Sequence, residues 1–290
     1  MSVTATFFPR PGPSSSAAQD LPVKRARLEG ILNGLGRVLI AYSGGVDSAV
    51  LLAEAHRVLG SRACGVIARS PSLPERELAD ALSVAREGGF PVRVIRTEEM
   101  DRAQYRANRP DRCYHCKTEL FEKLELLAVD EGWDTLAYGA VTDDLGDVRP
   151  GMAAAERHRI RAPLLEAGLS KLETRMLARR LGLRVWDKPQ SACLASRIPH
   201  GSEVTQEKLR QVELGENALK ERFGLRVVRL RHEGLKARIE VDPAEIARLL
   251  APEQQEAILT LVRGLGFSEM EIDPRGYRRA DPLPPNDLED

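Results

Sequence analysis

The chain has 290 residues, of which 42% are hydrophobic, 30% are charged and only 4% are aromatic. Its 43 Lys and Arg residues balance its 43 Asp and Glu residues, which argues against a broad, non-specific nucleic-acid surface. No apolar run is long enough to span a bilayer, and the first residues lack the apolar core of a secretory signal, so we expect a cytoplasmic protein.

The first two thirds of the chain alternate apolar runs with helical patterns. Residues 1–22, rich in Pro, Ser and Ala, are expected to form a mobile tail. Short apolar runs at 37–42, 63–70, 91–100 and 134–140 predict strands. This alternation predicts an open, mostly parallel α/β sheet with helices on both faces, in which ligands bind beyond the carboxyl ends of the strands.

Helical periodicity fills the gaps between these strands. The predicted helices cover residues 48–60, 72–89, 115–132 and 170–183. Ser72 is the expected N-cap of the second helix, and Ser170 with Glu173 forms a capping box in the last. Cys64 lies in an apolar strand and is expected to be a core residue.

The pattern changes near residue 201. A helix at about 205–223 precedes two alternating strands around a Gly-containing turn at 225–241, and a further strand is expected at 268–274. We therefore predict a small C-terminal α+β domain that contacts substrate or other subunits. The predicted division is a tail at 1–22, an ATP-binding domain at 23–201, the small domain at 202–278 and a disordered tail at 279–290.

One loop has the composition of a phosphate site. A predicted strand is joined to a helix through Ser43, Gly44, Gly45, Val46, Asp47 and Ser48. The glycines let backbone N–H groups approach an anion, and the helix start adds N–H donors and a positive dipole end. Asp47 does not favour a bare phosphate but suits a bridging Mg²⁺. We therefore predict binding of ATP with Mg²⁺, the plain alternative being a Gly-rich turn without a ligand.

Three cysteines predict sulfur or metal chemistry. Cys113 and Cys116 open a predicted helix, and Cys193 lies in a predicted loop. Three thiolates can hold three corners of a [4Fe–4S] cluster and leave one iron open. They can instead bind Zn²⁺ with His115 or His200 as the fourth ligand, and idle thiols are the third alternative.

The phosphate loop resembles the PP-loop, SGGxDS, of the ATP pyrophosphatase superfamily, whose members cleave ATP between the α- and β-phosphates, typically by adenylating a substrate oxygen. Over most of residues 25–278 the chain also resembles the LarE family of sulfurtransferases. This second resemblance is most specific in DDLGDVRPGMAAA (143–155), WDKPQSACLASRIPHG (186–201) and RLRHEGLKARIEV (229–241).

The resemblance implies a reaction. In the LarE family, ATP adenylates a carboxylate of pyridinium-3,5-biscarboxylic acid mononucleotide, and sulfur then replaces the oxygen that carries AMP. This reaction belongs to the biosynthesis of the nickel-pincer nucleotide, the cofactor of lactate racemase. One branch sacrifices a single cysteine, which matches Cys193. The other branch uses three cysteines that hold a [4Fe–4S] cluster carrying an extra sulfide. Cys113 and Cys116 match the additional pair, which implies the cluster branch and a sulfide donor.

The resemblance also implies site residues. Cys193 and Asp47 are the expected catalytic residues, and ATP contacts are expected at Ser43, Gly44, Gly45, Asp47, Ser48, Ala68, Ser70 and Gly139. Arg229 and Arg231 are implied to contact the substrate phosphate, with Glu240 as a nearby metal ligand. Arg197 is expected to steady the adenylated carboxylate, while solvated surface arginines are the alternative. Asp143 and Asp144 either support Mg²⁺ or cap a strand end.

Three alternative functions would use the same kinds of motif. A tRNA thiolase can combine a PP-loop with three cysteines, although the balanced charge and few aromatic residues weigh against tRNA. An amidotransferase-type synthetase would use ammonia and a structural Zn²⁺, and a nucleotide-binding module would catalyse nothing. The expected partners are a small pyridinium nucleotide and a sulfide donor, without a membrane, and we expect a homo-oligomer.

Overall fold

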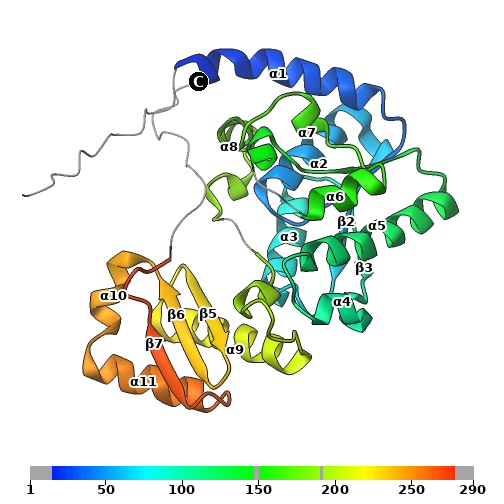
Figure 1. Cartoon of the computed structure of the whole chain (residues 1–290). Helices are drawn as coiled ribbons and strands as arrows, with labels where there is room; N and C mark the ends of the chain where they lie inside the picture. Colours follow the sequence, from blue (N-terminus) through cyan, green and yellow to red (C-terminus); the bar gives the residue numbers. More distant parts are fainter. Residues whose placement is uncertain (1–14, 147–149, 190–191, 278–290) are drawn as a thin grey trace, which may run out of the picture.

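The computed structural model describes residues 15–146, 150–189 and 192–277, which Figure 1 traces in chain order. The first sheet is parallel, as predicted. Its strand order is β3 (Val92–Arg96), β2 (Ala63–Arg69), β1 (Val38–Ala41) and β4 (Thr135–Tyr138). Strand β1 lies inside this sheet, so the loop that follows it opens between the ends of its neighbours.

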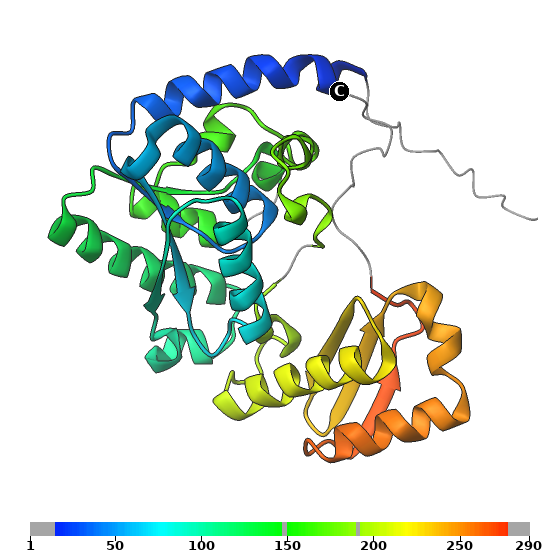
Figure 2. The same ribbon diagram turned by 180° about the vertical axis from the view of Figure 1, so that it is seen from behind.

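Both faces of the sheet are covered. Val38 and Ile40 of β1 pack into one apolar cluster and Leu39 and Ala41 into another, because successive strand side chains point to opposite faces. One face is covered by α1 (Ser15–Asn33), α2 (Val46–Leu59), α3 (Glu75–Glu87), α7 (Pro163–Glu166) and α8 (Lys171–Arg180), and the other by α5 (Arg112–Glu131) and α6 (Pro150–Arg157). Figures 1 and 2 show this layering from two sides.

Short helical turns connect these elements. They are η1 (Gly60–Arg62), η2 (Glu99–Asp101), α4 (Ala103–Arg106), η3 (Thr142–Gly146), η4 (Arg184–Asp187) and η5 (Leu194–Arg197). Two of them, η2 and η3, follow the carboxyl ends of β3 and β4, and η2 and η5 contribute to the site described below.

Of the two predicted helix caps, the structure confirms one and contradicts the other. The capping box of Ser170 and Glu173 is confirmed. Ser72 was wrongly predicted as an N-cap: α3 begins at Glu75, and the Ser72 hydroxyl lies 2.5 Å from that of Tyr105 instead. The predicted tail ended at residue 22, but α1 already begins at Ser15, because Leu21 is fully buried in the core.

A second sheet forms the C-terminal part. Its order is β5 (Val228–Glu233), β6 (Lys236–Val241) and β7 (Glu269–Ile272). Strands β5 and β6 form the predicted hairpin, with Gly234 at φ = 69°, while β7 pairs parallel to β6. The sheet packs with α9 (Gln206–Phe223), α10 (Pro243–Leu249) and α11 (Pro252–Arg263). The same core includes Leu194 and Ala195 of η5, and the division at residue 201 stays a prediction.

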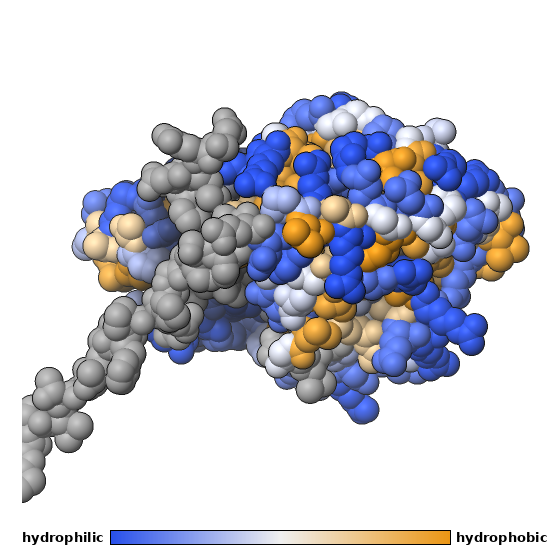
Figure 3. Space-filling view, turned by 90° about the horizontal axis from the view of Figure 1, so that it is seen from above, coloured by the Kyte–Doolittle hydropathy of each residue, from blue (hydrophilic) through white to orange (hydrophobic). Residues whose placement is uncertain are grey.

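The surface and the chain ends add little to these expectations. No helix in the described ranges is long and apolar enough to cross a membrane. The face in Figure 3 is mostly hydrophilic, with apolar residues scattered among charged ones. Residues 1–14 and 278–290, which contain much of the first predicted tail and all of the second, lie outside the described residues.

Candidate active site

The loop after β1 is shaped by close backbone contacts. Gly44 has φ = 71°, and a Cβ atom there would lie 2.4 Å from the Cβ atom of Ala81, so the position requires glycine. Gly139, just after β4, approaches the loop from the other side. A Cβ atom at Gly139 would lie 2.7 Å from the backbone nitrogen of Ser48. Both glycines therefore shape the loop through their backbones.

The loop also presents the start of a helix. The Ser48 hydroxyl accepts a hydrogen bond from the Ser43 N–H and donates one to the Gly45 carbonyl, each at 3.1 Å. Ser48 is thus a brace inside the loop. Helix α2 begins at Val46, and Gly45 gives it no side-chain cap. The first N–H groups of α2 are therefore suited to an anion, while ATP binding at this loop stays a prediction.

Asp47 is held by a residue far along the chain. Lys171 Nζ donates to Asp47 Oδ2 at 2.8 Å, and both side chains are largely buried. The backbone N–H of Lys171 donates to Asp143 at 2.7 Å, and that of Val141 donates to Asp144 at 2.9 Å. Asp144 thus holds the backbone just after β4, which agrees with the strand-end alternative for this residue, whereas Asp143 binds the first N–H group of α8.

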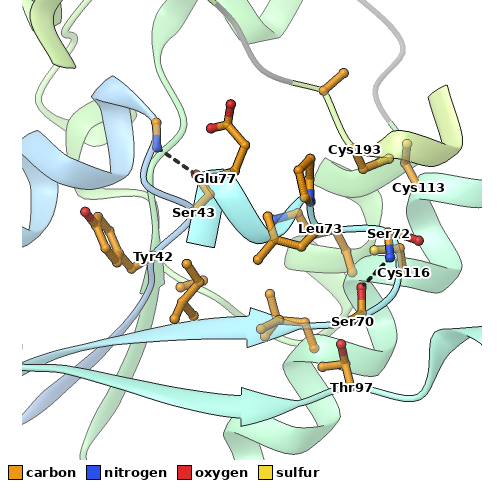
Figure 4. A pocket seen from close by; sticks show the side chains of 18 of the residues that line it. Tyr42, Ser43, Ser70, Ser72, Leu73, Glu77, Thr97, Cys113, Cys116 and Cys193 are labelled. Atoms are coloured by element: carbon orange, nitrogen blue, oxygen red, sulfur yellow. Dashed lines mark hydrogen bonds between the residues drawn. The ribbon is translucent and has the colours of Figure 1, made fainter. Parts of the chain in front are cut away.

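One cavity of about 400 Å³ connects the phosphate loop with the cysteines. Its walls contain these predicted site residues: Ser43, Gly45, Asp47, Ala68, Ser70, Cys113, Cys116 and Cys193. In Figure 4, Ser43 and Tyr42 lie on one side of the picture and the three cysteines on the other. Ala41 and Ala68 bring the carboxyl ends of β1 and β2 to the cavity, where ligands of parallel sheets bind.

The cysteines are free thiols. Burial, and then the neighbouring Glu99 carboxylate, raises the pKa of the Cys116 thiol well above its ordinary value. No three His, Cys, Asp or Glu side chains among the described residues converge as they would around one metal ion. Binding of a [4Fe–4S] cluster or of zinc at the three cysteines stays a prediction.

The remaining thiol and two histidines lie elsewhere. Cys64 is buried in β2, as expected for a core residue. His115 Nε2 lies 3.3 Å from an oxygen of Asp111, and His200 Nδ1 lies 3.1 Å from the carbonyl oxygen of Asn108. Neither histidine lines the cavity, so neither is placed as a fourth zinc ligand.

Arg197 braces the turn that carries Cys193. Its Nη1 donates to the carbonyls of Ala192 at 2.6 Å and Cys193 at 3.0 Å, and its Nε donates to Glu216 at 2.8 Å. Arg197 is only 2% exposed and does not line the cavity. The structure thus brings it to Cys193 as a support of the backbone, and the predicted contact with a substrate carboxylate stays a prediction.

A second support reaches the same turn from the loop after β2. The backbone N–H of Leu194 donates to the Ser72 carbonyl at 2.9 Å, and the Ser72 hydroxyl bonds to that of Tyr105. Tyr105 lines the cavity but is only 1% exposed, and burial raises the pKa of its phenol above the ordinary value. Its hydroxyl therefore keeps its proton at neutral pH.

The other predicted substrate residues lie outside this cavity. Arg231 donates to both oxygens of Glu240, at 2.9 and 2.8 Å, and to the Ser196 carbonyl at 3.0 Å. Glu240 also accepts from Arg238 at 2.8 Å. Because arginines occupy both oxygens of Glu240, metal binding there would require these ion pairs to open.

Arg229 lines a second cavity of about 390 Å³. This cavity shares Glu77, Lys188 and Pro189 with the first. Its other cationic residues are Arg184, Lys220 and Arg226. Asp80 and Asp187 also line it and pair with Arg184 and Arg226, so its charges are mixed, and the predicted contact of Arg229 with a substrate phosphate stays a prediction.

Three residues of the main cavity escaped the sequence analysis. Lys171 and Lys188 occur in the stretches LSK and WDKP, but a lone lysine in a sequence looks like an ordinary surface charge. Lys188 Nζ bonds to Asp80 at 2.6 Å and lies 2.8 Å from Glu77. Glu99, only 2% exposed, carries no sequence signal that distinguishes it from its neighbours.

Comparisons with known proteins add a family relationship. No family model matches the chain. An uncharacterised protein from Synechocystis sp. is 41% identical over 258 residues, which cover 89% of this chain and 96% of that protein. Pyridinium-3,5-bisthiocarboxylic acid mononucleotide synthase from Lactiplantibacillus plantarum is 32% identical over 259 residues, which cover 89% of this chain and 93% of that protein. The tRNA-specific 2-thiouridylase MnmA from Gluconobacter oxydans is 31% identical over 241 residues, which cover 69% of this chain and 64% of that protein.

Proposed function

Because the chain belongs to the family of pyridinium-3,5-bisthiocarboxylic acid mononucleotide synthases, we propose that it is an ATP-dependent sulfurtransferase of nickel-pincer nucleotide biosynthesis. Its proposed substrate is pyridinium-3,5-biscarboxylic acid mononucleotide, in which sulfur replaces a carboxylate oxygen. The observation that carries this proposal is the single cavity that joins the phosphate loop to three thiols. Activation and sulfur delivery would then share one cavity.

The activation step uses the loop side of the cavity. Ser43 and the first N–H groups of α2 donate hydrogen bonds to phosphate oxygens. Asp47 would hold Mg²⁺, which neutralises phosphate charge when bound. Lys171, paired with Asp47 at 2.8 Å, adds a cation beside the same phosphates. The substrate carboxylate bonds to the α-phosphorus of ATP, the bond to the bridging oxygen breaks, and pyrophosphate leaves.

The sulfur step uses the opposite side. Cys113, Cys116 and Cys193 would hold a [4Fe–4S] cluster, which supplies an iron open to external sulfide when bound. Arg197 keeps the Cys193 turn in place. Sulfide attacks the carbonyl carbon of the adenylate, the carbon–oxygen bond to AMP breaks, and AMP leaves with that oxygen. The buried Tyr105 wall limits the access of water, which would otherwise hydrolyse the adenylate.

The second cavity and the family resemblance support further features of this function. We place the substrate phosphate near Arg229, whose cavity adjoins the first. We also propose that the protein receives sulfide from a separate donor, is cytoplasmic, forms a homo-oligomer and has a role in lactate racemase maturation.

Product mass tests this function. The anaerobically reconstituted protein is incubated with ATP, Mg²⁺, sulfide and the biscarboxylate nucleotide. We expect AMP, pyrophosphate and a product in which one oxygen has been exchanged for sulfur. Cys193→Ala should stop sulfur transfer, whereas Cys64→Ala, the matched buried thiol, should not. AMP formation without any sulfur-containing product would contradict the proposal.

The protein mass after turnover separates two sulfur routes. Repeated turnover with Cys193 unchanged supports delivery through a cluster. Conversion of Cys193 to dehydroalanine after one turnover supports the sacrificial route, and a protein that takes up zinc but no iron excludes the cluster. The tRNA alternative is less well supported, because the chain spans 64% of the MnmA relative. Tight tRNA binding, with no activity on the pyridinium nucleotide, would favour it.

A further inference from the structure

Glu99 is a buried carboxylate with an unused oxygen. It lies in η2, directly beyond the end of β3, and lines the main cavity while being only 2% exposed. Its Oε2 atom is buried and has no hydrogen-bond partner among the described residues. A buried polar oxygen without a hydrogen-bond partner is costly, so a partner that enters the cavity would stabilise it.

The cationic side chains of the cavity are engaged elsewhere. Lys171 pairs with Asp47, and Lys188 with Asp80. Lys117 lies over the Phe121 ring, 5.8 Å from its centroid. Arg112 and Arg175 donate to backbone carbonyls. No ion pair to Glu99 is found in the part of the chain that the structure describes, so a protein cation does not fill this role.

The surroundings of Glu99 favour a metal centre at the cysteine end. Glu99 lines the same cavity as the three cysteines, and Met100, the next residue of η2, packs against the same apolar core as Cys116 and Cys193. Two thiols and one carboxylate thus share a desolvated region of the cavity. Thiolates and carboxylates are ligands of metal centres, so a centre bound here would supply the partner that the Glu99 oxygen lacks.

We propose that Glu99 is the fourth protein ligand of the centre held by Cys113, Cys116 and Cys193, and binds the iron that no cysteine occupies. This inference rests on the proposed cluster. When the cluster is bound, the Glu99 carboxylate would hold this iron and would give up its place to hydrosulfide, an exchange of one ligand for another that needs no oxidant or reductant. Glu99 thereby keeps the open iron from solvent until sulfur is available.

The test compares reconstituted full-length wild type with Glu99→Gln, Glu99→Asp and Glu98→Gln. Glu98 is a matched control, because it is the adjacent carboxylate but is exposed and pairs with Lys123. Iron and sulfide content, the electron paramagnetic resonance spectrum of the reduced cluster and cyanide affinity are measured. Cyanide binds an open iron and therefore reports competition by the carboxylate.

We expect Glu99→Gln to retain iron, to shift the spectrum and to bind cyanide about tenfold more tightly, if the wild-type carboxylate occupies the iron about 90% of the time. The spectrum and cyanide affinity of Glu99→Asp, whose side chain is one methylene shorter, should fall between those of Glu99→Gln and wild type. Glu99→Asp also provides the test if Glu99→Gln does not fold. Glu98→Gln should match wild type.

Identical spectra and cyanide affinities for wild type and both Glu99 variants would overturn the inference alone. An unchanged spectrum with weaker ATP binding by Glu99→Gln would also overturn it, because the carboxylate would then serve the nucleotide. Wild-type protein without iron would overturn the proposed cluster and this inference together, and AMP formation would show whether the activation step survives.

Discussion

Arg112, the first residue of α5, donates a hydrogen bond from Nη1 to the carbonyl of Ala195 at 2.8 Å. Arg112 directly precedes Cys113, and Ala195 lies two residues beyond Cys193. The same Nη1 also donates to the Asn108 side chain. The helix that begins with two cysteines and the turn that carries the third are therefore joined by one buried guanidinium.

Arg112→Met should loosen the cysteine end of the cavity. The change leaves the buried Ala195 carbonyl and the Asn108 amide oxygen without this donor, which should cost about 1–3 kcal/mol of unfolding free energy. We also expect less iron retained per chain after reconstitution. Urea unfolding and iron analysis measure both effects. Arg109→Met, three residues earlier and exposed, is the control. Equal iron retention in both variants would refute a bridging role.

Lys171→Met should impair activation. The change removes the cation that pairs with Asp47 inside the cavity, so phosphate charge is less well stabilised in the transition state. We expect the rate of AMP formation to fall about 10²-fold or more, with little change in iron content. Lys123→Met removes a lysine from an ion pair on the outer surface and should leave the rate unchanged. A normal rate for Lys171→Met would show that this lysine is only structural.

Gly139→Ala should displace the phosphate loop. The added methyl group would meet the backbone of Asp47 and Ser48 at 2.7–2.8 Å, and the overlap should cost about 1–3 kcal/mol. AMP formation should fall together with stability. Gly30→Ala in α1 has no atom within 4 Å of the new Cβ and should stabilise the protein by about 1 kcal/mol. Denaturant midpoints compare the two, and a neutral Gly139→Ala would argue against the close approach.

Acid should weaken the C-terminal sheet. Burial opposes the charge of Glu240, but hydrogen bonds from Arg231 and Arg238 outweigh it and lower the pKa of Glu240. Hydrogen bonds from Arg275, with help from Arg238, lower the pKa of Asp273. A carboxylate whose pKa is lower in the folded state stabilises the fold above its unfolded pKa of about 4, and this stability is lost as the pH falls through the folded value.

Glu240→Gln should therefore lower the urea midpoint at neutral pH and flatten its decline towards acidic pH. Glu253→Gln, at an exposed position of α11, should reproduce the wild-type curve. Parallel curves for Glu240→Gln and wild type would mean that this carboxylate titrates alike in the folded and unfolded chains.

The sequence by itself determined what depends on neighbours along the chain. The alternation of apolar runs and helical patterns predicted the parallel sheet, the Ser170–Glu173 spacing predicted a capping box, and Gly234 marked the hairpin turn. Each is a local property, because backbone geometry and side-chain periodicity are set within a few residues. The phosphate loop was recognisable for the same reason.

Only the tertiary structure decided which distant side chains meet. Lys171 reaches Asp47 across 124 positions, and Arg112 reaches Ala195 across 83. The sequence likewise offered no sign that Arg197 would be buried as a brace, or that Glu99 would line the same cavity as Cys116. Burial turns ordinary surface residue types into groups that must find a partner, and which partner is available depends on how the sheet, helices and turns pack.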